Sequence, residues 1–300
     1  MLLRWLLMTS ITQLVTKGSK LKMKKHLSFS QLNTYLGCGE SYRLSYVEGN
    51  RSAPNIAMVK GTSFHRVAEI NNTQKMESKK DMSLEEMLDI ASSQIDKAFK
   101  LDLYLKRSEQ SMSKKSLHGE AKDSLLATIP GLHKHSQGIQ PIAIEKEYDI
   151  KIPGVDRHVK AFIDLITDDN RVIDYKLTAK AKSQSATEND LQLALYSLIH
   201  KIYYGSFPRV QFHNYVSKKS KKTGEHSYSF NILETEDIYC ESKLQPLLST
   251  IKTVEESIQK GVFLPAESGS WRCSPNMCSH YQSCKYVKQE NNFSRISVPG

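Results

Sequence analysis

The 300-residue chain is predicted to form an α/β fold, with a central mixed sheet flanked by helices. From about Pro141 onwards, apolar residues alternate with polar ones in five short stretches, which is the period of a half-buried strand. Before, between and after these stretches, apolar residues recur at helical spacing. The expected strands are 142–152, 159–166, 172–175, 209–217 and 226–233.

Two capping patterns mark predicted helix starts. Ser28 and Gln31 have the spacing of a capping box, and so do Ser83 and Glu86. The second pair lies inside a lysine-rich stretch that we interpret as a helical insertion, in which 106–122 is a polar surface segment. The predicted helical regions are 28–36, 57–70, the insertion at about 71–130, 191–199 and 235–260.

The charge of the chain predicts its class of partner. A net charge of +10 favours a polyanion, with nucleic acid first and an anionic membrane surface second. A Lys-rich protein without such a partner is the alternative. No stretch approaches the roughly 18 apolar residues of a membrane span, so we predict no transmembrane helix. Thiols kept free for metal binding indicate a reducing compartment, which favours the cytoplasm.

The domain boundaries follow from composition. Residues 1–22 are predicted to be a poorly ordered extension, because their apolar run is short and interrupted by Arg4. Residues 23–290 are predicted to form a single domain, which includes a cysteine segment at about 265–290. Residues 291–300 are then a tail.

Two acidic residues and a lysine suit phosphodiester hydrolysis. Asp164 and Asp174 end adjacent predicted strands joined by a tight turn, so antiparallel pairing can bring their carboxylates together. Such carboxylates bind the hard divalent cations that activate water. Lys176 lies on the same strand face as Asp174, where an ammonium can hold the water or stabilise phosphate charge. The backbone carbonyl of Tyr175 is a further candidate ligand.

The order of the motifs is more informative than any one of them. An isolated Asp-x-Lys is usually a surface ion pair, and a lone histidine is usually a core residue. Here His65 precedes the two aspartates on a helix, with Glu69 four residues later on the same face. After Lys176 comes Gln192-x3-Tyr196 on the next predicted helix. A metal-dependent nuclease requires residue types of this kind in one site.

This succession resembles the PD-(D/E)xK nuclease superfamily, specifically its RecB-like branch. That branch includes the AddB nuclease domain, CRISPR-adaptation nucleases and many phage exonucleases. The resemblance covers roughly residues 26–290. It is carried by four segments: Gly61-Thr62-Ser63-Phe64-His65, Ala161-Phe162-Ile163-Asp164, Asp174-Tyr175-Lys176 and Gln192-Leu193-Ala194-Leu195-Tyr196.

The resemblance implies a restriction-endonuclease-like core and a role for each motif. His65, Asp164 and Asp174 would bind Mg²⁺ or Mn²⁺, and Gln192 and Tyr196 would contact DNA near the site. The accessory candidates are Glu69 and a glutamate of the preceding strand, Glu145 or Glu147.

Four of the five cysteines form a set: Cys38, Cys273, Cys278 and Cys284. Iron–sulfur members of the RecB-like branch hold a 4Fe–4S cluster with one early and three late cysteines. The resemblance therefore implies a cluster that staples the C-terminal segment to the N-terminal helix. The late spacing here is x4 then x5, whereas x2 then x5 is usual. Structural zinc is the alternative. Cys240 is interpreted as a core residue and His280 as a surface residue.

The predicted function is a metal-dependent DNA exonuclease acting in recombination, repair or phage DNA processing. The alternatives are a non-catalytic DNA-binding scaffold subunit and a structure-specific endonuclease. The expected partner is DNA, single-stranded or at duplex ends, and a helicase, recombinase or single-strand-binding protein is a candidate protein partner. A basic hairpin tip is a candidate phosphate contact, although such a tip is often only a solvated turn. It comprises Lys218, Lys219, Lys221 and Lys222.

Overall fold

The computed structural model describes residues 25–180, 182–235 and 241–287. The predicted extension, the predicted tail and Cys240 lie outside the described residues. Within the described ranges, no helix is long and apolar enough to cross a membrane.

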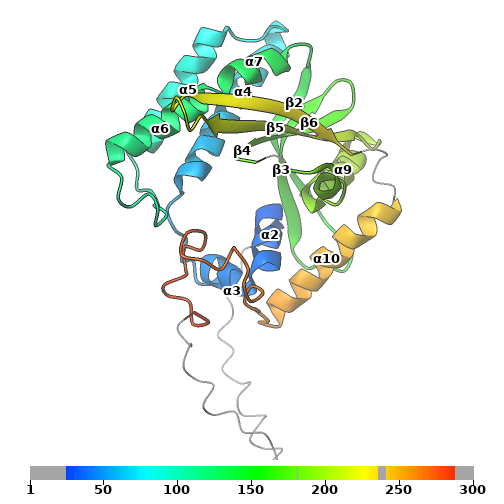
Figure 1. Cartoon of the computed structure of the whole chain (residues 1–300). Coiled ribbons are helices and arrows are strands. Elements are labelled where there is room, and N and C mark those ends of the chain that lie inside the picture. The colour runs from blue at the N-terminus through cyan, green and yellow to red at the C-terminus, as the bar shows by residue number, and fades with distance from the viewer. Residues whose placement is uncertain (1–24, 181, 236–240, 288–300) are drawn as a thin grey trace, which may run out of the picture.

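A six-stranded mixed sheet forms the centre of the molecule (Figure 1). Its strands are β1 (His26–Ser28), β2 (Pro141–Ile150), β3 (His158–Thr167), β4 (Arg171–Thr178), β5 (Arg209–Lys219) and β6 (His226–Glu234). The pairs β2–β3, β3–β4 and β5–β6 are antiparallel, whereas β1–β3 and β4–β5 are parallel. The five predicted strands are therefore confirmed. Strand β1 is an additional short strand that the alternation of apolar and polar residues did not reveal.

The sheet splits along β3, and this split creates the space for a site. One edge of β3 pairs with β2 over almost its whole length. The other edge pairs with β1 at its start and with β4 only at Leu165 and Ile166 near its end. Strand β4 therefore diverges from β3 immediately after these two pairs, at the level of Asp164.

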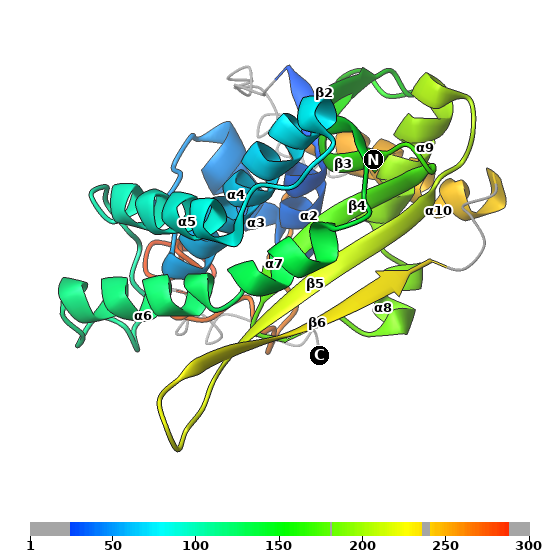
Figure 2. The same ribbon diagram turned by 90° about the horizontal axis from the view of Figure 1, so that it is seen from above.

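Four helices cover one face of the sheet (Figures 1 and 2). They bury a core cluster with Leu165, Ile173, Tyr175 and Tyr215 of the strands. The stretch 71–130 is therefore largely helical; α4, α6 and α7 contact the strands, whereas α5 packs on these three helices. The helices are α4 (Ile56–Ser78), α5 (Leu84–Ala98), α6 (Lys114–Leu126) and α7 (Ile129–Ser136).

The other face carries the second core cluster. Helix α9 packs on β5, α2 packs on β1, and α10 packs on α9 and α2. Together they bury strand residues such as Val159, Ile163 and Phe212. The elements on this side and its connections are α2 (Phe29–Gly37), α3 (Gly39–Tyr42), a π-helical turn η1 (Arg43–Val47), α8 (Gln184–Glu188), α9 (Leu191–Tyr204) and α10 (Glu241–Gln259). Mixed sheet and helical layers together confirm the predicted fold class.

Local details differ from the expectations in two places. The Ser83–Glu86 capping box is present, but the Gln31 side chain donates to the His26 carbonyl oxygen and to the Ser28 hydroxyl instead of closing a box. The stretch 106–122 is not merely polar surface, since α6 starts at Lys114 and buries Leu117 against α5. The helical spacing of the few apolar residues in α6 is hard to recognise in the sequence, because charged residues surround them.

Candidate active site and cysteine cavity

His65, Glu145 and Asp164 converge where the sheet splits. The Nδ1 atom of His65 on α4 lies 3.3 Å from Asp164 Oδ2 and 3.7 Å from Glu145 Oε1. One ligand atom from each of the three lies within 4.8 Å of the others, and no other such trio of His, Cys, Asp or Glu occurs among the described residues. One imidazole and two carboxylates are a donor set that Mn²⁺ and Mg²⁺ accept.

Strand register explains why these acidic groups meet. Leu165 pairs with Ile173, so the next position along places Asp164 opposite Asp174. The Asp164 carboxylate also accepts a hydrogen bond of 2.8 Å from the backbone N–H of Tyr175. The antiparallel pairing predicted from the short turn therefore brings the two aspartates together.

Glu145 enters the site through an irregular backbone. The pairs on either side of it place Glu145 opposite Asp164, and its φ of +43° is left-handed. A non-glycine residue held in this region stores strain, which is common at functional sites. Glu147, two residues later, is exposed and forms an ion pair with Lys160. The structure thus separates the two glutamates, since Glu145 reaches the cluster and Glu147 does not.

Lys176 is held beside the second aspartate. Its Nζ lies 2.5 Å from Asp174 Oδ2, an oxygen that has no other hydrogen-bond partner in the described structure. Asp174 is 1% exposed, and burial raises its pKa to about 6 despite the opposing effect of Lys176. Burial disfavours the charged lysine, but Asp174 and Asp164 outweigh burial and raise the pKa of Lys176. The ammonium therefore keeps its proton at neutral pH.

A hydrogen-bonded relay fixes the lysine from the other side. Lys176 Nζ donates to Gln192 Oε1 at 3.1 Å, and Gln192 Nε2 donates to the Tyr196 hydroxyl at 2.8 Å. That hydroxyl donates to the Phe162 carbonyl oxygen at 2.8 Å. Gln192 and Tyr196 are four residues apart on α9 and so share one face. Tyr196 is only 4% exposed, and burial raises its pKa far above the usual value, so its hydroxyl stays a donor.

A profile of a known nuclease family matches residues 26–286, with the description PD-(D/E)XK nuclease superfamily. The chain belongs to this superfamily. Its members hydrolyse phosphodiester bonds of nucleic acids and typically use Mg²⁺ or Mn²⁺, and the cluster of His65, Glu145 and Asp164 provides a fitting acidic site. No curated protein sequence matches the chain.

A solved structure has a fold similar to that of this superfamily member. A crystal structure described as that of a candidate exonuclease from Eubacterium rectale has a TM-score of 0.50 and 13% identity, and the match covers 92% of this chain and 90% of that one. A second crystal structure, that of SSO0001, is 13% identical over 86% of this chain and 95% of that one. Its TM-score of 0.32 is too low to bear on the fold.

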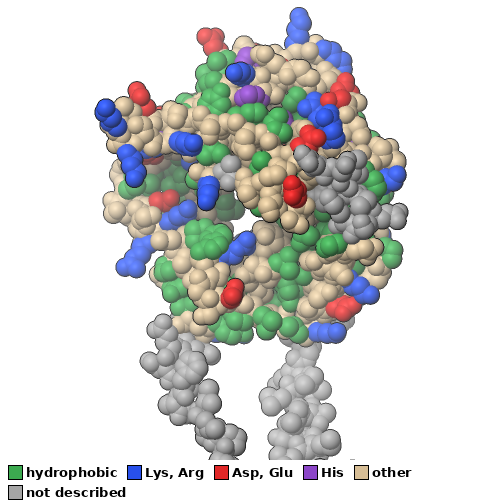
Figure 3. All heavy atoms as spheres, turned by 45° about the vertical axis from the view of Figure 1, so that its right-hand side comes forward, with side chains coloured by type: hydrophobic (Ala, Val, Ile, Leu, Met, Phe, Trp, Pro, Cys, Tyr) green, Lys and Arg blue, Asp and Glu red, His purple; other side chains and the backbone are tan. Residues whose placement is uncertain are grey.

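The remaining predicted nuclease residues lie at differing distances from the cluster. Glu69 is one helical turn beyond His65 and forms an ion pair with Arg66 at 2.6 Å. Together with His65 and Glu145, it lines a cavity of about 370 Å³. Tyr175 packs its buried ring near His65, and its hydroxyl accepts from Asn72 at 3.3 Å. One face of the molecule is hollowed at its centre, and both basic and acidic side chains lie around the hollow (Figure 3).

The predicted basic tip projects beyond the sheet at the end of the β5–β6 hairpin (Figure 2). All four of its lysines are exposed, and Lys219 forms an ion pair with Glu120 of α6. None of its lysines lines the cavity beside His65 and Glu145, and a DNA contact at the tip stays a prediction.

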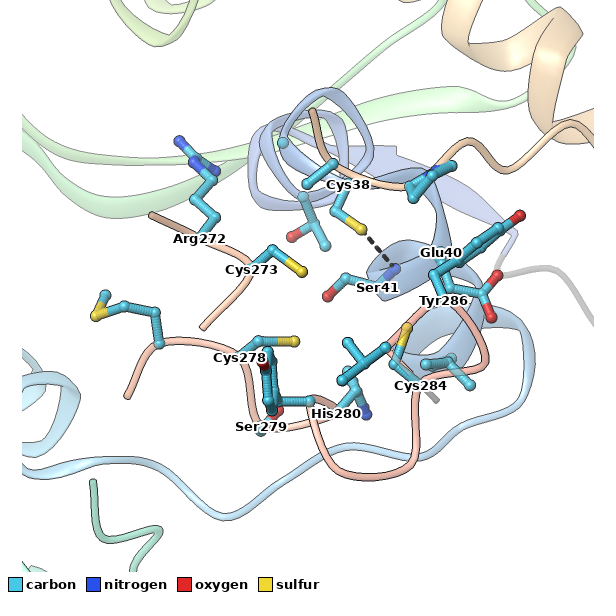
Figure 4. Close-up of a pocket in the computed structure, with 18 of the residues that line it drawn as sticks. Cys38, Glu40, Ser41, Arg272, Cys273, Cys278, Ser279, His280, Cys284 and Tyr286 are labelled. Atoms are coloured by element: carbon cyan, nitrogen blue, oxygen red, sulfur yellow. Dashed lines mark hydrogen bonds between the residues drawn. The ribbon is translucent and has the colours of Figure 1, made fainter. Parts of the chain in front are cut away.

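The four predicted cysteines surround one cavity of about 270 Å³ in this nuclease (Figure 4). All four sulfur atoms point into it, from the α2–α3 junction for Cys38 and from the C-terminal segment for the others. The backbone N–H of Ser41 donates to Cys38 Sγ at 3.4 Å. Burial raises the pKa of the Cys273 and Cys278 thiols, and nearby cysteines raise it further. A cation would offset this repulsion between thiolates.

Contacts without metal also hold the cysteine segment against α3. An added Cβ on Gly39 would lie 2.8 Å from the Leu264 backbone, and the Glu40 N–H donates to the Leu264 carbonyl oxygen at 3.2 Å. The buried Glu40 carboxylate pairs with Arg43 at 2.7 Å and lies 3.6 Å from Lys285. His280, expected at the surface, is buried. The reason is that its ring sits against η1, where Nε2 lies 2.8 Å from the Ser45 hydroxyl.

Proposed function

We propose that this chain is a metal-dependent DNA nuclease, most closely an exonuclease of the RecB-like branch, in which residues 23–290 act as one domain. The observation that carries the proposal is the meeting of His65, Glu145 and Asp164 beside the Asp174–Lys176 pair. Three carboxylates and one imidazole next to a fixed ammonium are the groups that phosphodiester hydrolysis requires.

Each residue has a defined role in this proposal. His65, Glu145, Asp164 and Asp174 hold Mg²⁺ or Mn²⁺, with the Tyr175 carbonyl as a further ligand. The bound metal supplies an activated water and neutralises phosphate charge. Lys176, fixed between Asp174 and Gln192, stabilises the negative charge that develops on the phosphate oxygen.

Gln192 and Tyr196 act mainly by positioning Lys176. The burial of Tyr196 and its bond to the Phe162 carbonyl favour this role over direct DNA contact. Gln192 is partly exposed and remains a candidate for both roles.

The class of substrate rests on charge and on the RecB-like motifs. The net charge of +10 favours a polyanion, and Lys218, Lys219, Lys221 and Lys222 offer an exposed basic tip for phosphates. We propose DNA as the substrate, in the context of recombination, repair or phage DNA processing in the cytoplasm. A helicase, recombinase or single-strand-binding protein is the proposed kind of partner.

For the four cysteines we propose a 4Fe–4S cluster. Their sulfur atoms point into one cavity of about 270 Å³, and one early and three late cysteines are the ligand pattern of the iron–sulfur members of the RecB-like branch. Four thiolates would also suit structural zinc, which is the alternative. Such a cluster would link Cys38 to a segment more than two hundred residues later in the chain.

The cluster proposal is tested by metal analysis of protein purified anaerobically. We expect iron and acid-labile sulfide in equal amounts, both lost in Cys273→Ser. Zinc at one per chain without sulfide would replace the cluster by a structural zinc site.

The nuclease proposal is tested with end-labelled DNA and Mn²⁺ or Mg²⁺. We expect metal-dependent cleavage that falls by about a hundredfold or more in Lys176→Ala, because a preorganised charge-stabilising group is lost. Lys260→Ala removes an exposed lysine at the end of α10 and should leave the rate unchanged. DNA binding without cleavage in the wild type would favour a scaffold subunit, and cleavage of closed circular DNA would favour an endonuclease.

A further inference from the structure

Phe162 is a large apolar side chain left exposed beside the candidate metal site. It is 53% exposed, although its neighbours Ala161 and Ile163 are buried in the core on the opposite face of β3. It lies two residues before Asp164, which is about 7 Å along a strand. In the β2–β3 register, a single residue pair separates the Phe162 level from the level of Glu145 and Asp164.

The surface around Phe162 is ionic and already paired. Glu147 lies opposite Phe162 and forms an ion pair with Lys160, and Asp149 pairs with His158 at 2.6 Å. Two large apolar side chains of the described β2–β3 ribbon are exposed, Phe162 at 53% and Ile142 at 42%, and Phe162 is the one that lies between these ion pairs. Two carboxylates make this surface unfavourable for a phosphate. A flat, neutral group that covers the ring fits it better.

The backbone of Phe162 belongs to the frame that holds Lys176. Its carbonyl oxygen accepts from Tyr196, which is bonded to Gln192, which in turn accepts from Lys176. A group stacked on the Phe162 ring is therefore held at a fixed position relative to the ammonium. The ring is placed to orient the part of a substrate that flanks the reacting phosphate.

We propose that Phe162 is a stacking platform for an unpaired DNA base next to the scissile phosphate, so that the site takes single-stranded DNA. This inference rests on the proposed nuclease function. Aromatic side chains bind bases of any sequence through the π-face of the base. A base inside a duplex has both faces stacked on its neighbours, whereas an unpaired base leaves a face free for the ring.

The first test measures binding in a Lys176→Ala background, where hydrolysis does not interfere. Phe162→Ala should weaken binding of single-stranded DNA by roughly 5- to 150-fold, which is the range for loss of one base–aromatic stack. Phe162→Trp should restore the affinity. Ile232→Ala removes a similarly exposed apolar residue, 47% exposed on β6, and should change nothing. Equal affinity of Phe162→Ala and its parent would overturn the proposal.

The second test locates the base. Single strands carrying 2-aminopurine, a fluorescent base, at successive positions should show one position whose fluorescence changes on binding and whose change is lost in Phe162→Ala. An abasic site at that position should reduce cleavage by wild type and leave Phe162→Ala unaffected. If the wild type cleaves DNA but no such position is found, the proposed role of Phe162 is wrong and the proposed nuclease function stands. A wild type that does not cleave would instead reject the proposed function. Loss of self-association in Phe162→Ala with unchanged DNA binding would assign the ring to contacts between protein copies and overturn the proposal.

Discussion

Removal of a single oxygen atom tests the relay that holds Lys176. In Tyr196→Phe, the Phe162 carbonyl loses its donor and the Gln192 amide loses its acceptor. An unsatisfied buried polar group costs about 1–3 kcal/mol, so the free energy of unfolding should fall within that range. Gln192 is then free to turn, and Lys176 loses its second anchor.

The same change should slow catalysis. Support groups that orient a reacting residue typically account for about ten- to a hundredfold in rate, so we expect kcat on single-stranded DNA in Mn²⁺ to fall by that factor. The loss should be smaller than in Lys176→Ala, because the ammonium itself remains. Tyr203→Phe is the matched control, since its hydroxyl donates to the Asp149 carbonyl at 2.9 Å from an exposed position on the same helix.

A double-mutant cycle separates positioning from simple destabilisation. Tyr196→Phe and Gln192→Ala break the same chain of hydrogen bonds, so their effects on kcat should not add. Additive losses, or an unchanged kcat in a destabilised Tyr196→Phe protein, would refute the relay as a positioning device. Denaturant unfolding of the same proteins measures how far each substitution lowers the free energy of unfolding.

Three further predictions follow from buried ionisable side chains. Glu255→Ala leaves Arg157 buried without its bidentate partner and should lower the free energy of unfolding by about 3–5 kcal/mol; Glu256→Ala, exposed and next in sequence, should change urea stability by less than about 1 kcal/mol. Burial lowers the pKa of His213 to about 3, so the folded state stays neutral while the unfolded chain gains a proton below about pH 6.5. The free energy of unfolding should therefore fall as the pH drops from about 6.5 towards 3, by at most about 1.4 kcal/mol per pH unit, and His213→Gln should show a shallower slope in urea titrations. Burial disfavours the charged form of His65, but Asp164 and Glu145 outweigh this effect and raise the pKa of His65 to about 10. Mn²⁺ must therefore displace a proton in order to bind, and calorimetry should show its affinity rising by up to about tenfold per pH unit below pH 10. A pH-independent affinity would contradict this competition.

Several features were predictable from the sequence because they depend on near neighbours in the chain. Alternation of period two marked five strands, since successive side chains on a strand point to opposite faces. The two-residue spacing of Asp174 and Lys176 and the four-residue spacing of Gln192 and Tyr196 placed each pair on one face of its element. A short turn between β3 and β4 made the approach of Asp164 to Asp174 foreseeable.

Other features were decided by tertiary structure alone. The choice of Glu145 over Glu147 depends on a left-handed residue at one register position, which no local pattern encodes. The bond from Tyr196 to the Phe162 carbonyl depends on how α9 packs beside β3. Strand β1 is too short to show a period, and its pairing with β3 is a long-range choice.

The sequence by itself determined which chemical groups are available and which faces of each element they occupy, because propensity and periodicity act over a few residues. Only the tertiary structure decided which groups meet. The split of the sheet at the level of Asp164 brings α4, β2, β3 and β4 to one point, and close packing of Gly39 on the Leu264 backbone brings Cys38 to the late cysteines. Both depend on register and packing between segments far apart in the chain, which local spacing does not specify.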